Sequence, residues 1–107
     1  MSKRRMCNRR GDISELQVAT HYLENGYEVF RNLCSTGLID LVVICPKTKQ
    51  VFFYDVKTMT EYKRVDNVAH IYANPTSEEQ RKFGVETVAL YKDKIYTDPI
   101  RIKERVK

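Results

Sequence analysis

The sequence predicts one mixed α/β domain, in which helices flank a central β-sheet. Apolar residues near the N-terminus recur at the spacing of one helical face. Two later apolar runs, 38–45 and 50–57, are rich in β-branched and aromatic residues and are separated by a turn. The chain has 107 residues, 42% of them hydrophobic, which is enough for one compact core and too little for two domains.

The first half of the chain predicts a helix followed by three strands. Gly11-Asp12 opens the helix and Asn25-Gly26 ends it, as a residue in the left-handed conformation does. The strands are expected at 27–30, 38–45 and 50–57, with a turn at 46–49 between the last two. The buried face of the helix is expected to consist of Ile13, Leu16, Ala19, Thr20 and Leu23.

The second half predicts a loop, a short helix and a closing hairpin. Residues 58–75 are polar, charged and aromatic without clean periodicity, which indicates a long loop with one candidate strand at 69–72. Thr76-x-x-Glu79 resembles a capping box that opens a second helix, ending near Gly84. The hairpin is expected at 85–91 and 94–97.

Basic residues are concentrated at both ends of the chain. Nineteen Lys and Arg against fourteen Asp and Glu give a net charge of +5. We expect residues 1–10 to form a basic arm before a single domain at 11–107. Such an arm favours polyanions because binding releases condensed counterions, although a solvated tail that aids solubility explains the charge equally well. The arm supplies four candidate nucleic-acid contacts: Arg4, Arg5, Arg9 and Arg10.

Cysteine usage and hydropathy exclude several classes of protein. The three cysteines are far apart and form no pair, which argues against a zinc site and a disulfide scaffold. No apolar run approaches the roughly 20 residues that span a bilayer, and no apolar stretch follows the charged N-terminus. We expect a soluble, cytoplasmic protein without a membrane partner.

Two acids are expected to face each other across the hairpin of the second and third strands. If the turn is centred between Lys47 and Thr48, Val43 faces Phe52 and Asp40 faces Asp55; a turn of odd length would shift this pairing by one residue. Side chains so opposed have Cβ atoms about 5 Å apart, and like charges there repel. A hard divalent cation compensates such a pair, because Mg²⁺ takes oxygen ligands at about 2.1 Å, commonly from one or two carboxylates.

Lys57 completes this candidate active site. It lies two residues beyond Asp55, so the period of a strand places both side chains on one face, while Val56 points to the other. A metal ion and an ammonium group beside a phosphate would generate hydroxide and stabilise the charge of the transition state. Taken singly, Asp40 fits a turn cap, and Asp55 with Lys57 fits an exposed ion pair of little energetic value.

The segment resembles a known family. Ile39-Asp40, followed after fourteen residues by Asp55-Val56-Lys57, resembles the signature of the PD-(D/E)XK nuclease superfamily. The stretch from Arg31 to Asp40 and the preceding helix are similar to the archaeal Holliday-junction resolvases of that superfamily. Two positions depart from the pattern, since Ile39 replaces proline and Asp55 replaces the usual glutamate.

The resemblance implies a restriction-endonuclease-like core and a homodimeric nuclease that requires Mg²⁺, with Mn²⁺ able to substitute. It implies Asp40 and Asp55 as metal ligands, a main-chain carbonyl ligand at Val56 and a catalytic role for Lys57. It further implies Glu15 as an additional catalytic acid and metal ligand. Asp12-x-x-Glu15 fits a helix-capping box equally well.

Further candidate DNA contacts lie near the expected active face: Arg31, Ser35, Lys63 and Arg64. With Tyr62 and His70 they could bind phosphates or stack on a base, although an ordinary surface loop explains the same residues. Ser35 also fits a turn, and Gln80 fits either a phosphate contact or an exposed helical position.

Three functions follow from these residues. The first is a Mg²⁺-dependent endonuclease that acts on branched DNA in recombination. The second is a repair or end-processing nuclease with the same chemistry and a different substrate. The third is a nucleic-acid-binding module without catalytic activity, which the complete set of two acids and a lysine argues against.

Overall fold

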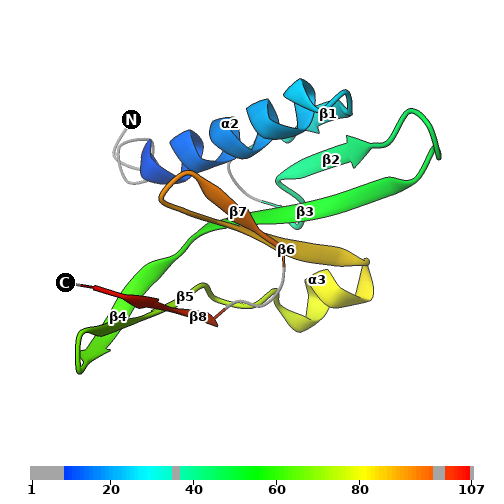
Figure 1. Ribbon diagram of the computed structural model, residues 1–107. Coiled ribbons are helices and arrows are strands. Elements are labelled where there is room, and N and C mark those ends of the chain that lie inside the picture. Colours follow the sequence, from blue (N-terminus) through cyan, green and yellow to red (C-terminus); the bar gives the residue numbers. More distant parts are fainter. Residues whose placement is uncertain (1–8, 35–36, 98–100, 107) are drawn as a thin grey trace.

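Two β-sheets and two helices form the described part of the chain (Figure 1). The structure is a computed structural model that describes residues 9–34, 37–97 and 101–106. The first sheet has five strands in the order β1-β2-β3-β6-β7, and the second has three in the order β4-β5-β8. The elements are α2 (Arg9–Glu24), β1 (Glu28–Arg31), β2 (Leu41–Ile44), β3 (Val51–Thr58), β4 (Thr60–Val65), β5 (Val68–Tyr72), α3 (Glu78–Lys82), β6 (Val85–Tyr91), β7 (Lys94–Tyr96) and β8 (Arg101–Arg105).

The predicted α/β class is confirmed: the five-stranded sheet is mixed, and α2 covers one of its faces (Figure 1). Strands β3 and β6 are parallel, and the other pairs in the sheet are antiparallel. The predicted register of the β2–β3 hairpin is also confirmed, because Val43 pairs with Phe52 and Leu41 with Tyr54.

Helix α2 begins at Arg9 rather than at Gly11, and it ends as predicted before Gly26, which has a φ of 87°. The predicted buried face of this helix is wrong for its three large apolar residues, although Ala19 does pack against the core. Ile13, Leu16 and Leu23 are about half exposed, whereas Val18 is fully buried. The sheet contacts the side of the helix that carries Val18, which is rotated from the predicted apolar stripe. Helical spacing therefore showed which residues share a face but not which face the sheet covers.

The second sheet differs from the long loop that the sequence predicts. Residues 60–72 form a hairpin, β4–β5, rather than a loop with one short strand. Its turn residues Asp66 and Asn67 both have positive φ, 52° and 63°, as the two-residue turn of a hairpin requires. Strand β8 from the C-terminal end then pairs with β5.

The short helix α3 is capped one residue later than predicted. Ser77, not Thr76, is the N-cap: its hydroxyl accepts a bond from the Gln80 N–H, and the Gln80 side chain accepts one from the Ser77 N–H. The Gln80 amide also donates to the carbonyl of Leu38, at 3.0 Å. This bond ties α3 to the segment that leads into β2.

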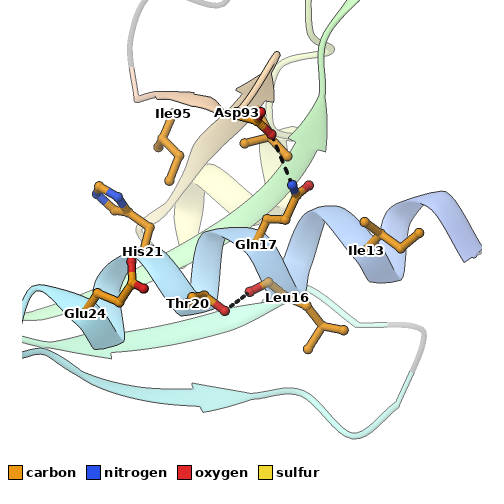
Figure 2. Close-up of a pocket in the computed structure, with 9 residues that line it drawn as sticks. Ile13, Leu16, Gln17, Thr20, His21, Glu24, Asp93 and Ile95 are labelled. Carbon is orange, nitrogen blue, oxygen red and sulfur yellow. Dashed lines mark hydrogen bonds between the residues drawn. The ribbon is translucent and has the colours of Figure 1, made fainter.

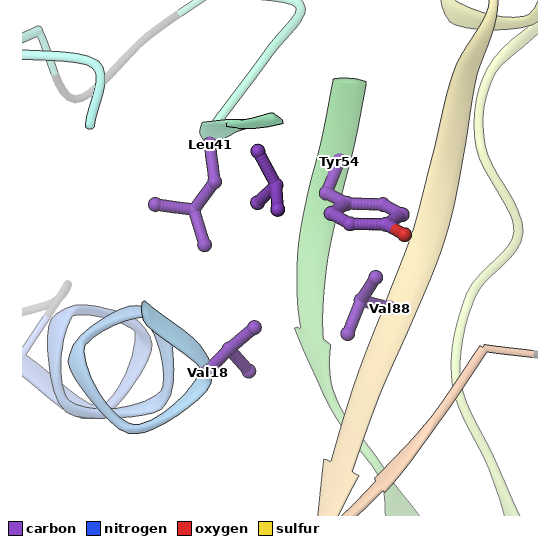
Figure 3. Packing of buried hydrophobic residues seen from close by; sticks show 5 residues of the cluster. Val18, Leu41, Tyr54 and Val88 are labelled. Atoms are coloured by element: carbon purple, nitrogen blue, oxygen red, sulfur yellow. The ribbon is translucent and has the colours of Figure 1, made fainter. Parts of the chain in front are cut away.

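Two separate hydrophobic clusters stabilise the fold. The first lies between α2 and the five-stranded sheet, where Val18 points towards side chains on β2, β3 and β6 (Figure 3). Its buried members are Val18, Leu41, Val43, Tyr54 and Val88. The second joins the two sheets and is made of Met59, Ala69, Ile71, Ala73 and Ala89. The second sheet is therefore packed against the first rather than extending freely.

The face of the first sheet that points away from α2 remains partly uncovered. Val29 packs in the cluster under α2, so Phe30 points to the opposite face, where it is 53% exposed. Phe30 pairs with Val42, which pairs with Phe53, and so an apolar row crosses β1, β2 and β3. Among the described residues, no helix is long and apolar enough to cross a membrane.

Truncating Val18 is expected to destabilise the protein more than truncating Leu16 on the same helix. Val18→Ala removes two fully buried methyl groups and should lower the free energy of unfolding by about 2 kcal/mol. Leu16→Ala should change it by less than about 0.5 kcal/mol, because that side chain is half exposed. Urea denaturation measures both, and a larger loss for Leu16→Ala would restore the helix face predicted from the sequence.

Candidate metal centre

Asp40 and Asp55 are brought together at the end of the β2–β3 hairpin. The regular pairing ends at Leu41 and Tyr54, so the two acids are not paired directly as predicted. Instead, the Asp40 N–H donates to the carbonyl of Tyr54 at 2.9 Å. The Asp40 side chain reaches across the hairpin, where its Oδ2 accepts a bond from the Val56 N–H at 2.8 Å.

Asp55 lies within β3 and carries an unsatisfied oxygen. The residue is buried, at 7% exposure, because β3 is flanked by β2 and by β6. The Lys57 Nζ is 3.2 Å from Asp55 Oδ2, a distance that defines an ion pair. The approach lacks hydrogen-bond alignment, so Oδ2 has no hydrogen bond within the described residues. A buried carboxylate oxygen without one is costly unless another group satisfies it.

Burial and neighbouring acids raise the pKa of Asp40 to about 6. Burial is the largest cause, since it disfavours the charged form. The negative charges of Asp55 and Glu15 act in the same direction, and the bond from the Val56 N–H opposes them. The site thus holds negative charge that is only partly compensated, which is the condition that favours a cation.

Glu15 reaches this region from α2 but is held by an arginine. The Arg31 Nε lies 3.1 Å from Glu15 Oε1, and its Nη2 lies 3.4 Å from Asp12 Oδ1. Asp12 and Glu15 do not form the capping box that their spacing fits, because α2 begins at Arg9 and Asp12 already lies inside its first turn. Arg31 therefore neutralises two acids at the edge of the site. A contact between Arg31 and DNA would require that its ion pairs with Asp12 and Glu15 break.

The residues fit Mg²⁺ as a two-carboxylate site. No group of three or more His, Cys, Asp or Glu side chains in the described ranges is arranged to hold a metal ion. Asp40 and Asp55 alone match the usual protein contribution to Mg²⁺, whose remaining ligands are waters and phosphate oxygens. The unsatisfied Asp55 Oδ2 is the observation that supports this fit. The main chain of Val56 is fixed beside both acids through its N–H.

Among the remaining predicted DNA contacts, the two whose side chains the structure describes, Lys63 and Arg64, do not lie on the β2–β3 hairpin. Arg4, Arg5 and Ser35 lie outside the described residues, and Arg9 and Arg10 lie at the start of α2. Lys63 and Arg64 belong to β4 in the second sheet, where Arg64 pairs with Glu61. Gln80 is partly buried and uses its amide within the fold, so it does not occupy the freely exposed helical position that was the alternative to a phosphate contact.

One contact that positions α2 beside the site could not be predicted from the sequence. The hydroxyl of Ser14, which is buried, bonds the hydroxyl of Thr58 at the end of β3. This bond fixes α2 against the strand next to Lys57 and so helps to place Glu15. A lone serine on a helix gives no indication of such a partner, because the partner is distant in sequence.

An open cleft of about 400 Å³ lies on the other flank of α2, between this helix and the β6–β7 turn. In Figure 2, Gln17 bridges the cleft to Asp93, with an Nε2–Oδ1 distance of 3.3 Å. The apolar lining of the cleft includes Ile13, Leu16 and Ile95. None of the acids of the candidate metal centre lines it, so the cleft is separate from that site.

The substitution Asp40→Asn is expected to stabilise the protein free of divalent ions, in a pH-dependent way. The pKa of Asp40 is higher in the folded protein, about 6, than its usual 3.8, so the ionised form opposes folding. The wild type should therefore lose stability relative to Asp40→Asn as the pH rises from about 4 to about 7. Thermal denaturation with EDTA measures the difference. Mg²⁺ at pH 7.5 should raise the Tm of the wild type but not of Asp40→Asn, and a Tm difference independent of pH would contradict the assignment.

Comparison with known proteins identifies the fold but no family. No protein-family model and no curated protein matches the chain. Among solved structures, the chain is similar to "The structure of a bacterial homing endonuclease: I-Ssp6803I", with a TM-score of 0.60 and 18% sequence identity. The match covers 91% of this chain and 72% of that one. The chain thus has an α/β fold that is also found in an endonuclease.

Proposed function

We propose that the protein is a Mg²⁺-dependent endodeoxyribonuclease that hydrolyses DNA phosphodiester bonds, with Mn²⁺ able to substitute. The observation that carries the proposal is the convergence of two acids and a lysine on one hairpin: Asp40 bound to the Val56 N–H, and Asp55 paired with Lys57. The fold shared with a homing endonuclease supports the same reaction class. Fold alone does not determine activity, so the residues of the site carry the argument.

Each residue has a distinct role in this proposal. A bound Mg²⁺ would supply an activated water and neutralise phosphate charge. Asp40 and Asp55 would hold the cation; the bond from Val56 keeps the Asp40 carboxylate oriented across the hairpin. The Lys57 ammonium, 3.2 Å from Asp55, provides a fixed positive charge for the extra negative charge of the transition state. Glu15 would orient solvent at the edge of the site once Arg31 turns to the DNA.

We further propose a four-way junction or another branched DNA as the substrate, in recombination. The support is the similarity of the stretch from Arg31 to Asp40 to the archaeal resolvases. A repair or end-processing nuclease with the same site is the alternative, and a comparison of junction, flap, linear duplex and single-stranded DNA separates them. A binding module without turnover would bind DNA and cleave none of these with Mg²⁺ or Mn²⁺.

Removing either side chain of the ion pair is expected to abolish cleavage and preserve DNA binding. Asp55→Asn removes a metal ligand, and Lys57→Ala removes the positive charge, which should lower the single-turnover rate by about 10²- to 10³-fold or more. Lys47→Ala, in the exposed turn of the same hairpin, is the matched control and should cleave like the wild type. Gel assays of labelled junction DNA with Mg²⁺ give the rate, and anisotropy in EDTA gives the affinity. Undiminished cleavage by Asp55→Asn would exclude this site.

We also propose that two copies of the chain associate, which would present two sites to two DNA strands. The uncovered face of β1–β2–β3, with its row of Phe30, Val42 and Phe53, supports a second copy as the occupant. Phe30 is half exposed and Val42 and Phe53 are partly buried, so this row offers an apolar surface that a second copy would cover.

Sedimentation velocity tests this association. The wild type is expected to sediment as a dimer, and Phe30→Glu should sediment as a monomer because it places a charge in the apolar row. Leu16→Glu, on the exposed flank of α2, is the control and should remain dimeric. A monomeric wild type would refute the association, and a monomeric Leu16→Glu would move the interface to the helix.

A further inference from the structure

The second sheet presents an outward face that the candidate metal centre does not use. Ala69 and Ile71 of β5 are buried in the cluster between the sheets. Because side chains alternate along a strand, Val68, His70 and Tyr72 point to the opposite, outer face. The pairing with β8 places Arg101, Lys103 and Arg105 on this same face. The outer face, as named here, consists of Thr60, Tyr62, Lys63, Val65, Val68, His70, Tyr72, Arg101, Lys103 and Arg105.

Every charged residue of the outer face is basic. Lys63 on β4 is opposite His70, which is opposite Lys103 on β8, and Arg101 and Arg105 lie two residues to either side. All four Lys and Arg are exposed, and none makes a salt bridge within the described ranges. Cations that are close together and lack counter-charges are poised to bind an anion.

The acids of the same strands point to the other side of the sheet. Glu61 is opposite the buried Ile71 and pairs with Arg64, at 2.9 Å. Glu104 accepts bonds from the Tyr91 hydroxyl and from Lys92, at 3.0 and 3.1 Å. Charge is therefore segregated between the two faces of one sheet. Of the two basic residues predicted for this segment, Lys63 lies on the outer face and Arg64 does not.

Aromatic rings lie between the cations. The Tyr62 ring packs edge-on against His70 and Tyr72, with centroids 5.9 and 5.2 Å apart, and Lys63 lies over Tyr62. Burial lowers the pKa of His70, and the positive charges of Lys63 and Lys103 lower it further, as expected for an imidazole between two cations. Because the rings pack edge to face with one another, they form a rigid ridge rather than parallel plates between which bases could be inserted.

We propose that the outer face of β4–β5–β8 binds the phosphate backbone of duplex DNA. Alternate residues of a strand are about 6.6 Å apart and strands about 4.8 Å apart, so the four cations cover roughly 13 by 10 Å. A duplex carries one negative charge per about 1.7 Å of its axis, so several phosphates face a patch of this length. The inference rests on the proposed function for its choice of DNA, but the face lies on a sheet separate from the cleaving residues.

The test removes three positive charges from β8 and compares the effect on DNA binding with that of removing three positive charges outside the outer face. The full chain with Arg101→Ala, Lys103→Ala and Arg105→Ala is compared with Lys47→Ala, Lys82→Ala and Lys94→Ala, three exposed positions outside the outer face. Both variants carry a net charge of +2, which is +5 minus three. Anisotropy with a 30-base-pair duplex in EDTA, at a series of NaCl concentrations, measures affinity without cleavage. Circular dichroism checks that both variants fold.

The β8 variant should bind duplex about 10²-fold more weakly at 0.1 M salt, and its salt slope should fall by about 2 to 3. The control should keep the slope of the wild type. Equal losses in the two variants would overturn the proposal. The proposal would also be overturned if the wild type bound single-stranded DNA more tightly than duplex and Tyr62→Ala reduced that affinity more than the loss of the cations does. That result would indicate base stacking rather than backbone binding. If the β8 variant binds and cleaves DNA like the wild type, this inference fails and the proposed nuclease function stands. If the wild type binds duplex through this face but cleaves no DNA, the nuclease function fails and this inference stands.

Discussion

The candidate site depends on the hydrogen bond from the Val56 N–H to Asp40 Oδ2. At the end of the hairpin, where the regular pairing of β2 with β3 ends, this bond at 2.8 Å acts together with the bond from the Asp40 N–H to the Tyr54 carbonyl to hold Asp40 against β3. The energetic effect of the bond from Val56 is opposed by burial and by repulsion from Asp55 and Glu15, which together raise the pKa of Asp40. The fold thus holds an acid where its charge is unfavourable, as expected of a site prepared for a cation.

The predictions that depended on turn position and strand period within one hairpin were the reliable ones. The β2–β3 register followed from the centre of one turn, and the β6–β7 hairpin followed from the turn at Lys92 and Asp93, both with positive φ. The placement of Asp55 and Lys57 on one face required only the period of a strand. These features are determined within about twenty residues of chain, where geometry leaves few alternatives.

What the sequence could not provide depends on distant partners. The face of α2 that is buried is decided by the orientation of the sheet, and so Val18 lies inside while Leu16 and Leu23 do not. Strand β8 gave no clear pattern because it has one buried side, lined by Ile102, and one side of basic residues. Its role becomes apparent only from its pairing with β5. The hairpin β4–β5 lacked a clear pattern for a similar reason, since both faces of β4 carry polar residues and its turn, Asp66-Asn67, lies within a mostly polar segment.

The passage from β3 to β4 has a consequence for how the two sheets work together. β3 ends at Thr58 in the first sheet and β4 begins at Thr60 in the second, so one buried residue, Met59, separates them (Figure 1). Its N–H is bound to the carbonyl of Leu90, which leaves no slack at the junction. Lys57 therefore stands at a fixed distance along a continuous strand from the second sheet. Side chains alternate along a strand, so inserting or deleting one residue at Met59 would turn the side chains of β4 to the opposite face of the second sheet. The one-residue length of this junction therefore fixes the position of the outer face relative to the candidate metal centre.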